Sequence, residues 1–400
     1  MGACDSPSVP ALLASFAVTV LALAGCAPAQ GRGPAHPVAP ALAARSSGPA
    51  RVEVPRTIVT PVDAASIPQL YDRARAQLRA GDAAGAAKSF ERVFELDPHG
   101  DLADDSLFEA GEAWEHAGDR EAALAQYEQT ARRFPKSDLG RAALVRSIRL
   151  LAFLERWKRA EQASDLLMKR YHDLRPFESI VAYSGKALGL VQDGDLDTAT
   201  YYIEKGRTVI EDHRMDEAGR IPRDLAQLYY ALGEVRRIKA ERIKFNPVPP
   251  EFAAVLENRC QLLLDAQSAY SDAMRAYDAH WSAMAGYRVG ELYESLHQDL
   301  MAIPAPKAAD SSPKEKLFEG AMRLRYSVLL EKALTMMDHT VRMAGRTGEH
   351  SDWVLRAREA RVKIHQAMKK EDAAIAALPY TRAQLQAALD RLKKNKKKQP

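Results

Sequence analysis

Hydrophobic and small residues recur with the same spacing in two successive stretches, residues 67–100 and 104–137. Each stretch has a small residue in its first half, then a Gly-Asp pair, an alanine, an aromatic residue and a closing proline. These positions are Ala74, Gly81, Asp82, Ala86, Phe90 and Pro98 in the first stretch, and Gly111, Gly118, Asp119, Ala123, Tyr127 and Pro135 in the second. Glycine ends a helix without a Cβ clash, and proline stops the helix that follows. The pattern therefore predicts two helix–turn–helix hairpins in a row.

The apolar side chains of such a hairpin need a neighbour to pack against. In the first hairpin we expect Leu70, Leu78, Phe90, Val93 and Leu96 to face neighbouring helices. One hairpin cannot bury this face alone, so units of this kind stack side by side. The sequence therefore predicts an array of hairpins.

Two more units follow with altered turns. Residues 141–176 fit a degenerate third unit, in which Glu155-Arg156 stands where Gly-Asp is expected, and residues 180–213 restore the pattern with Gly194-Asp195. Each intact unit spans 34 residues, and its pattern resembles the tetratricopeptide repeat (TPR). The ending Phe134-Pro135-Lys136-Ser137 also resembles the repeat ends of periplasmic TPR proteins in the Tol-Pal and β-barrel assembly systems. The resemblance implies an all-α fold, a right-handed α-α superhelix (TPR-like solenoid).

In the region 214–380 the helical pattern continues, but with longer segments between the turn residues. Residues 251–285 contain no Gly or Pro, and apolar residues lie seven apart there, which fits a coiled-coil arm or, as we prefer, one long solenoid helix packed on its neighbours. Residues 289–293 resemble a first TPR helix and residues 331–334 a second one. We therefore expect elongated C-terminal helices, and Thr381 and Gln384 fit a capping box that opens a terminal helix within 381–400.

Composition and charge exclude some classes of partner. The net charge is +4, but residues 391–400 hold six Lys or Arg and no acid, so the rest of the chain carries −2. No basic face for nucleic acid is indicated. The three cysteines, Cys4, Cys26 and Cys260, have no metal-binding spacing, and Cys260 fits a buried, inert thiol. We expect no metal and no cofactor.

The first residues predict a leader and a lipid anchor. Ala11 to Gly25 is an apolar run of fifteen residues, which is short for a membrane span and suited to a signal-peptide core. It ends Leu23-Ala24-Gly25-Cys26, which resembles the lipobox of bacterial lipoproteins. The resemblance implies that residues 1–25 are a lipoprotein signal peptide and that Cys26 is lipidated. Met1-Gly2 with Cys4 also fits a myristoylation and palmitoylation pattern, and an ordinary secretory signal is a further alternative.

We expect residues 26–62 to form a disordered Ala/Pro-rich tether, because this segment has seven prolines after Cys26 and no apolar period. An extended tether of this length reaches roughly 100 Å. Ala27 replaces the aspartate that retains many Gram-negative lipoproteins in the inner membrane. The resemblance therefore places residues 63–213, the TPR repeats, at the outer membrane and facing the periplasm.

No motif predicts catalysis. The sequence lacks His-Glu-x-x-His and Gly-x-Ser-x-Gly, and its histidines are scattered. We expect a protein that is not an enzyme, while the unfamiliar region 218–380 leaves room for a hidden active site if a pocket there gathers carboxylates with strongly shifted pKa values.

The resemblance predicts a binding groove along the concave face, which the first helix of each unit lines. The residues expected there are Tyr71, Arg75, Arg79, Phe108, Glu112, Arg146 and Arg149. The arginines could hold a peptide carboxylate, and the two aromatic residues could supply apolar contacts. We expect a scaffold for other envelope proteins or peptide segments; the alternative is an accessory factor that presents substrates to an outer-membrane barrel-assembly or cell-wall machine.

Overall fold

The computed structural model of the chain describes residues 67–216, 222–305 and 312–396. The predicted signal peptide, Cys26 and the tether, together with the last residues of the basic tail, lie outside the described residues. Within them the chain is helical, with no strand. The helices are α2 (Ile67–Arg79), α3 (Ala83–Leu96), α4 (Ala103–Ala117), α5 (Arg120–Arg133), α6 (Asp138–Phe153), α7 (Trp157–Arg170), α8 (Pro176–Asp193), α9 (Leu196–Asp212), the 3-10 turn η2 (Arg223–Leu225), α10 (Ala226–Glu241), α11 (Phe252–Arg275), α12 (Ala279–Met301), α13 (Ser312–Thr347), α14 (Asp352–Ala376) and α15 (Arg382–Lys396).

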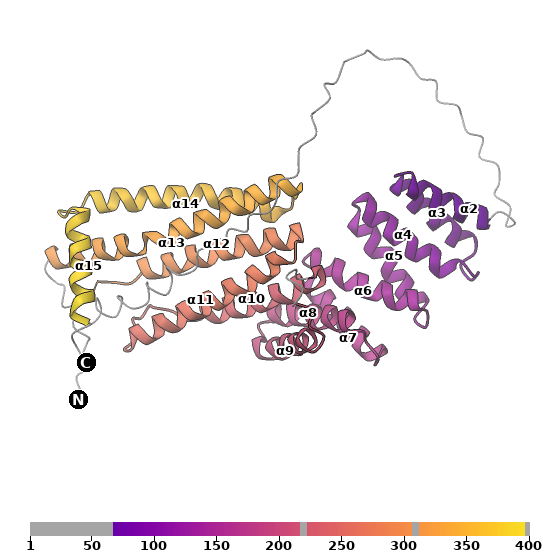
Figure 1. The fold of residues 1–400 in the computed structure, drawn as a ribbon, viewed down its shortest axis with the longest axis horizontal. Coiled ribbons are helices and arrows are strands. Elements are labelled where there is room, and N and C mark those ends of the chain that lie inside the picture. Colours follow the sequence, from indigo (N-terminus) through magenta and orange to yellow (C-terminus); the bar gives the residue numbers. More distant parts are fainter. Residues whose placement is uncertain (1–66, 217–221, 306–311, 397–400) are drawn as a thin grey trace, which may run out of the picture.

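Consecutive helices pack as hairpins, and successive hairpins stack (Figure 1). The first helices of neighbouring units also touch, because α4 packs on α6, α6 on α8, α8 on α10, α10 on α12 and α12 on α14. The predicted fold class, an all-α solenoid of TPR-like hairpins whose C-terminal helices are elongated, is confirmed.

The hairpin turns have the predicted chemistry. Gly81, Gly118 and Gly194 adopt φ of +88°, +85° and +80°. The aspartate after each glycine accepts a hydrogen bond from a backbone N–H in the first turn of the next helix, at 3.0 to 3.1 Å. This satisfies a donor that the helix start leaves without a partner.

The third unit turns without a glycine. Glu155 adopts φ of +56° in the position of the glycine, and Arg156 makes no side-chain cap. A non-glycine residue in this left-handed conformation costs about 1–2 kcal/mol. The degenerate turn is therefore strained, and the contacts of Glu155 described below hold it in place.

Small residues let the two helices of a unit approach closely. A Cβ on Gly111 would lie 2.6 Å from the Tyr127 ring, and a Cβ on Gly233 would lie 2.5 Å from the Tyr270 ring. The second pair joins α10 to α11, so this long pair of helices keeps the contact of a TPR unit. The elongated helices are therefore lengthened units of the same array.

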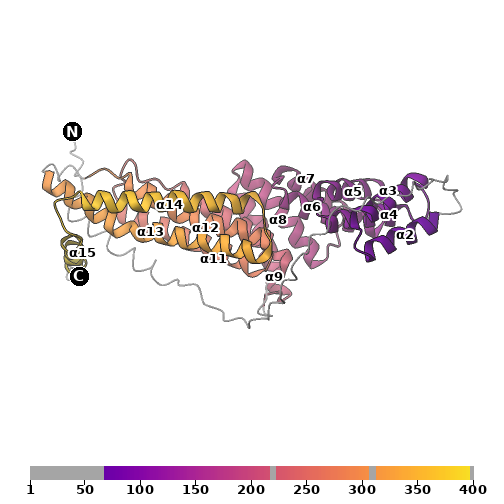
Figure 2. The ribbon, with the colours of Figure 1, turned by 90° about the horizontal axis from the view of Figure 1, so that it is seen from above.

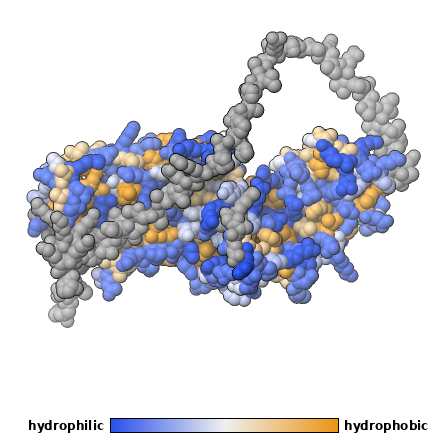
Figure 3. Space-filling view, viewed as in Figure 1, coloured by the Kyte–Doolittle hydropathy of each residue, from blue (hydrophilic) through white to orange (hydrophobic). Residues whose placement is uncertain are grey.

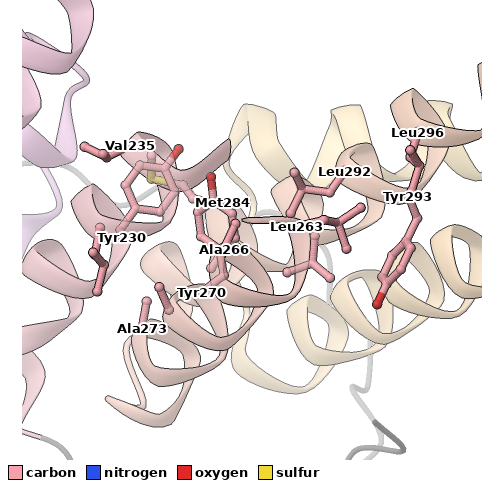
Figure 4. Close-up of a cluster of buried hydrophobic side chains, with 14 of the residues drawn as sticks. Tyr230, Val235, Leu263, Ala266, Tyr270, Ala273, Met284, Leu292, Tyr293 and Leu296 are labelled. Atoms are coloured by element: carbon pink, nitrogen blue, oxygen red, sulfur yellow. The ribbon is translucent and has the colours of Figure 1, made fainter. Parts of the chain in front are cut away.

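The predicted core of the first hairpin is largely correct. Phe90 and Val93 are buried, and Leu70 and Leu78 are half-buried against the same cluster. The largest cluster lies further along the chain, where α10, α11 and α12 meet (Figure 4). The core of the described residues is therefore divided into several clusters that follow one another along the stack.

The expectation of one long helix over residues 251–285 is wrong. Helix α11 ends at Arg275, Tyr277 takes φ of +57°, and Asp278 caps α12 by accepting a hydrogen bond from the Trp281 N–H at 3.0 Å. Tyr277 continues the seven-residue spacing but is 64% exposed, so it does not pack where the spacing places it. The segment is two antiparallel-packed solenoid helices, which also excludes the coiled-coil arm.

The molecule has two visibly different parts. The long helices α11 to α14 run side by side and α15 crosses their far ends, while α2 to α5 extend at the opposite end (Figures 1 and 2).

The predicted capping box at the start of α15 is confirmed, because the Thr381 N–H donates to Gln384 at 2.8 Å and the Gln384 N–H donates to the Thr381 hydroxyl at 3.2 Å. None of the described helices is long and apolar enough to cross a membrane.

The array also touches itself across a long sequence distance. The turn after α6 meets the start of α12 and the start of α14 through five residues, which we call the closing contact: Phe153, Glu155, His280, Glu349 and Trp353. The Phe153 and His280 rings stack at 3.7 Å, and the Glu349 carboxylate lies 3.5 Å from His280. The second half of the solenoid therefore folds back onto the third unit.

Candidate binding surface

The predicted groove residues lie along the first helices α2, α4 and α6, on a surface that we call the inner face. Tyr71 is only 8% exposed, with its ring 5.4 Å from that of Phe90 and edge-on to it. Its hydroxyl donates to Glu109 at 2.9 Å, and Arg75 approaches the same carboxylate to 3.6 Å. Arg79 is exposed at the end of α2. Arg75 and Arg79 are therefore accessible, whereas Tyr71 mainly packs in the core.

The next two helices pair their charged residues with each other. Phe108 is half-buried and lies 5.5 Å from the Tyr127 ring. Arg146 on α6 donates to Glu112 at 3.0 Å and to Glu115 at 3.1 Å, both on α4. The structure thus brings Glu112 and Arg146 together. Each of these two predicted groove residues already has an ion-pair partner within the protein.

Arg149, one turn further along α6, makes an ion pair of 2.9 Å with Asp224 of η2. Sequence reasoning missed Asp224 and Glu115 as members of this surface. The pairing of Glu112 with Arg146 did have a signal, because these residues are 34 positions apart and occupy equivalent places in successive units. No sequence pattern pointed to Asp224, because η2 belongs to no intact repeat.

The inner face therefore carries a ladder of ion pairs that joins α2 to α4, α4 to α6, and α6 to η2. Arg75 faces Glu109, Arg146 faces Glu112, and Arg149 faces Asp224. The side chains of Arg146, Glu112 and Arg149 are 37%, 35% and 35% exposed. Pairs this exposed contribute only about 0–1 kcal/mol each. A ligand that carries both acidic and basic groups could exchange them at little cost.

Acidic groups on α4 are partly shielded from water. Burial raises the pKa of Glu109 and of Asp105, and for Asp105 the neighbouring Asp104 carboxylate adds to the effect. A cation placed between these carboxylates would favour their charged form. Arg75 already has this effect, because its positive charge lowers the pKa of both Glu109 and Asp105.

A second polar cluster lies where α10, α11 and α12 meet, beside a pocket of about 330 Å³. Glu234 lies 2.8 Å from Arg237 and 3.0 Å from Arg288, and it accepts a hydrogen bond of 2.6 Å from the Tyr270 hydroxyl. Trp353 closes the pocket on the side of α14. The cluster therefore gathers a carboxylate, two cations and a phenol in the core.

The pKa shifts of this cluster do not suit proton transfer. Burial raises the pKa of Glu234. The combined effect of Arg288, Arg237 and the Tyr270 hydroxyl lowers it by more, so the net shift of the pKa is downward. Burial raises the pKa of Tyr230 and Tyr270, so both phenols stay protonated. A general acid or base needs a pKa near the working pH. The pKa values of Glu234, Tyr230 and Tyr270 all shift away from neutral pH, as is typical of an ion network with a structural role.

Chemistry elsewhere is equally limited in the described part of the chain. There, no three His, Cys, Asp or Glu side chains gather in a way that could hold a metal ion. Cys260 is buried, and burial raises the pKa of its thiol to about 12. A thiol with this pKa is a poor nucleophile, as the sequence predicted.

Comparison with known proteins gives distant likenesses to solved repeat proteins. No family model matches the chain, and no curated protein matches it. Among solved structures, a tetratricopeptide repeat protein from Parabacteroides merdae is 15% identical with a TM-score of 0.38, and it aligns over 74% of this chain and 99% of its own. A circular tandem repeat protein is 14% identical with a TM-score of 0.20, over 77% of each chain. The description of the fold as TPR-like rests on the hairpins, turns and close contacts of this chain.

Proposed function

We propose that this protein is a lipid-anchored, TPR-like scaffold that holds other envelope proteins or peptide segments at the periplasmic side of a bacterial outer membrane. The observation that carries the binding part of the proposal is the inner face, where half-exposed ion pairs link stacked helices. The anchoring part is supported by the sequence alone, through the Leu23-Ala24-Gly25-Cys26 motif and the Pro-rich segment that follows it.

The ladder suggests how an extended peptide binds. An acidic side chain of the peptide displaces Glu112 from Arg146, and a basic one takes the place of Arg75 beside Glu109. Each exchange replaces one ion pair by another, so little free energy is lost, and apolar contacts with Phe108 add affinity. The positions of these pairs, from α2 through α4 to α6 and η2, set the spacing of charges that a partner needs.

The anchor is tested by replacing Cys26 with serine. We expect the Cys26→Ser protein to lose incorporation of a labelled fatty acid and to leave the membrane fraction, because no thiol remains for lipid attachment. The matched control is Cys4→Ser, which removes the other N-terminal thiol and should change neither result. A Cys26→Ser protein that stays in the membrane, or a Cys4→Ser protein that leaves it, contradicts the lipoprotein assignment.

The binding surface is tested by charge reversal at two exposed arginines of α2, of which Arg75 approaches Glu109 only to 3.6 Å. Arg75→Glu combined with Arg79→Glu leaves the pairs of Arg146 and Arg149 intact, whereas reversing Arg149 would also break its pair with Asp224. We expect proteins crosslinked to the wild-type chain in envelope membranes to be recovered about tenfold less with the double variant.

The matched control is Arg132→Glu, an exposed arginine on α5 outside the inner face. It should leave the recovery of the same proteins unchanged. If the double variant recovers its partners as well as wild type does, the inner face is not the binding surface.

A further inference from the structure

We propose that the groove between α11 and α13 is a second docking site, and that it receives an acidic amphipathic helix from a partner protein. The groove has a volume of about 980 Å³ and its floor is α12. It is bounded by the second helices of two long units, whereas the inner face is built from first helices. It is therefore separate from the surface on which the proposed scaffold function rests.

Most of the surface that lines the groove is apolar, although hydroxyl and amide side chains also contribute to it. Val289 and Tyr293 of α12 form the floor and are 1% and 2% exposed. Leu264, Met274, Met336 and Met343 stand half-buried along the walls. Figure 4 shows Tyr293 at the opposite end of the core cluster from Tyr230. Methionine adapts its shape to different neighbours and is favoured where a protein takes up amphipathic helices.

The rim of the groove is positively charged. Arg275, Lys332, Arg342 and Arg346 line it, against a single carboxylate, Asp272. Asp272 is already paired with Arg275 at 3.1 Å. Among the residues that the structure describes, no carboxylate lies within ion-pair distance of Arg342 or Arg346. An apolar floor with cations along its edge is complementary to a helix that has one apolar face and acidic flanks.

The length of the groove agrees with a short helix. Its lining extends from Leu264 to Arg275 on α11 and from Lys332 to Arg346 on α13. At 1.5 Å per residue these stretches are roughly 17 and 21 Å long. A helix of about 12–14 residues has the same length. The groove is therefore long enough for three to four turns, in which apolar residues at i, i+3, i+4 and i+7 form one face.

The occupant is another molecule rather than a segment of this chain. Residues 1–66 contain three acidic residues and four arginines, and the segment 397–400 contains two lysines and no acid. Neither segment has the negative charge that the rim calls for. A partner with Glu or Asp on both flanks of an apolar stripe does.

The test uses the full chain and a labelled synthetic 14-residue helix with leucine at i, i+3, i+4 and i+7 and glutamate on the flanks. A photo-crosslinker at Thr335 reports whether the peptide lies in the groove. We expect binding by fluorescence anisotropy, crosslinking at Thr335, and binding weakened about tenfold by Arg342→Glu combined with Arg346→Glu. Binding should also weaken with added salt.

Two controls separate this site from general charge attraction. The variant Arg358→Glu with Lys369→Glu reverses two exposed cations on α14 and should bind the peptide as wild type does. The same peptide with lysine in place of glutamate should bind at least tenfold more weakly.

The proposal is overturned if the acidic peptide fails to bind, if the lysine peptide binds equally well, or if phosphatidylglycerol vesicles displace the acidic peptide and show the same dependence on Arg342 and Arg346. Arg75→Glu with Arg79→Glu should not affect the peptide, so failure at the groove and failure of the inner face are distinguishable.

Discussion

The indole N–H of Trp353 donates a hydrogen bond of 2.7 Å to the Glu155 carboxylate, across 198 residues of sequence. Trp353 is 2% exposed, and the guanidinium groups of Arg288 and Arg356 lie 5.0 and 4.5 Å from its ring. Glu155 is the residue that makes the third turn with a positive φ. Glu155 thus forms the strained turn after α6 with its backbone and binds the start of α14 with its side chain.

Glu155→Gly separates these two roles. Glycine removes the backbone strain, worth about 1–2 kcal/mol, but loses the hydrogen bond to Trp353, worth about 1–3 kcal/mol. In the wild-type background we expect a small net change in the free energy of unfolding. In a Trp353→Phe background the hydrogen bond is already absent, so the same substitution should stabilise by about 1 kcal/mol. Urea denaturation followed by circular dichroism measures both.

Glu155→Ala is the control for this cycle, because it loses the hydrogen bond without gaining the freedom of glycine. It should destabilise the wild type by about 1–3 kcal/mol. Equal effects of Glu155→Gly in the two backgrounds would mean that the bond to Trp353 contributes nothing to stability.

His280 makes the closing contact sensitive to acid. Its ring is 5% exposed and stacked on Phe153, and burial lowers its pKa, an effect that Glu349, Asp278 and Glu155 partly oppose. The unfolded chain therefore takes up this proton more readily, with an ordinary pKa of about 6.5. Stability contributed by neutral His280 is full above that value and falls as the pH drops through it towards the folded-state pKa.

We expect His280→Gln to reduce the loss of thermal stability between pH 7.5 and 5.5, since the variant has no proton to take up there. The exposed His350→Gln is the matched control and should behave as wild type. An NMR titration of the His280 ring should give a midpoint below 6.5; a midpoint above it would contradict the expected sign.

Glu234 neutralises two cations in the core, and its removal should be costly. Glu234→Gln leaves Arg237 and Arg288, whose side chains are 13% and 20% exposed, without this carboxylate. Breaking a buried pair in this way costs about 3–5 kcal/mol, which Glu241 and Glu291 reduce by remaining near the two arginines. We expect a loss of about 2–4 kcal/mol in the free energy of unfolding.

The control is Glu257→Gln, at an exposed glutamate of α11. We expect it to change the free energy of unfolding by no more than about 0.5 kcal/mol. If both variants unfold at the same urea concentration as wild type, the Glu234 cluster does not support the core.

Two helix glycines should respond to alanine with opposite signs. A Cβ on Gly233 would lie 2.5 Å from the Tyr270 ring, so Gly233→Ala should destabilise by about 1–3 kcal/mol. A Cβ on Gly345 would meet no atom within 4 Å, so Gly345→Ala should stabilise by about 0.5–1 kcal/mol through its higher helix propensity. Melting temperatures of the two variants, recorded together, check the signs. A stable Gly233→Ala protein would show that α10 and α11 can move apart.

Much of the fold could be predicted because it follows from local chemistry. Gly81, Gly118 and Gly194 reveal their turns, since left-handed backbone favours glycine, and Glu155 could be placed by its register in the repeat. The break at Tyr277 could not be predicted, because neither Gly nor Pro marks it. The local signal there is Asp278, which caps α12, but a single aspartate within an otherwise helical pattern does not identify a helix break.

The binding surface was harder to predict than the fold. Register in the repeat placed Arg75 and Arg146 on the first helices, but it did not reveal which acidic side chain each would meet. Arg149 pairs with Asp224 because η2 packs against α8 and α10, which depends on the tertiary arrangement. The closing contact joins residues too distant in sequence for any periodicity to relate them.

An open array, in which each unit touches only its neighbours, can gain or lose a unit without harm to the others. The bond from Glu155 to Trp353 removes that freedom for everything between them, because one inserted or deleted hairpin would carry α14 out of reach of the α6 turn. The hairpins before α6, and α15 after α14, lie outside this loop. Growth or shortening by whole units that preserves this bond is therefore confined to the two ends of the array.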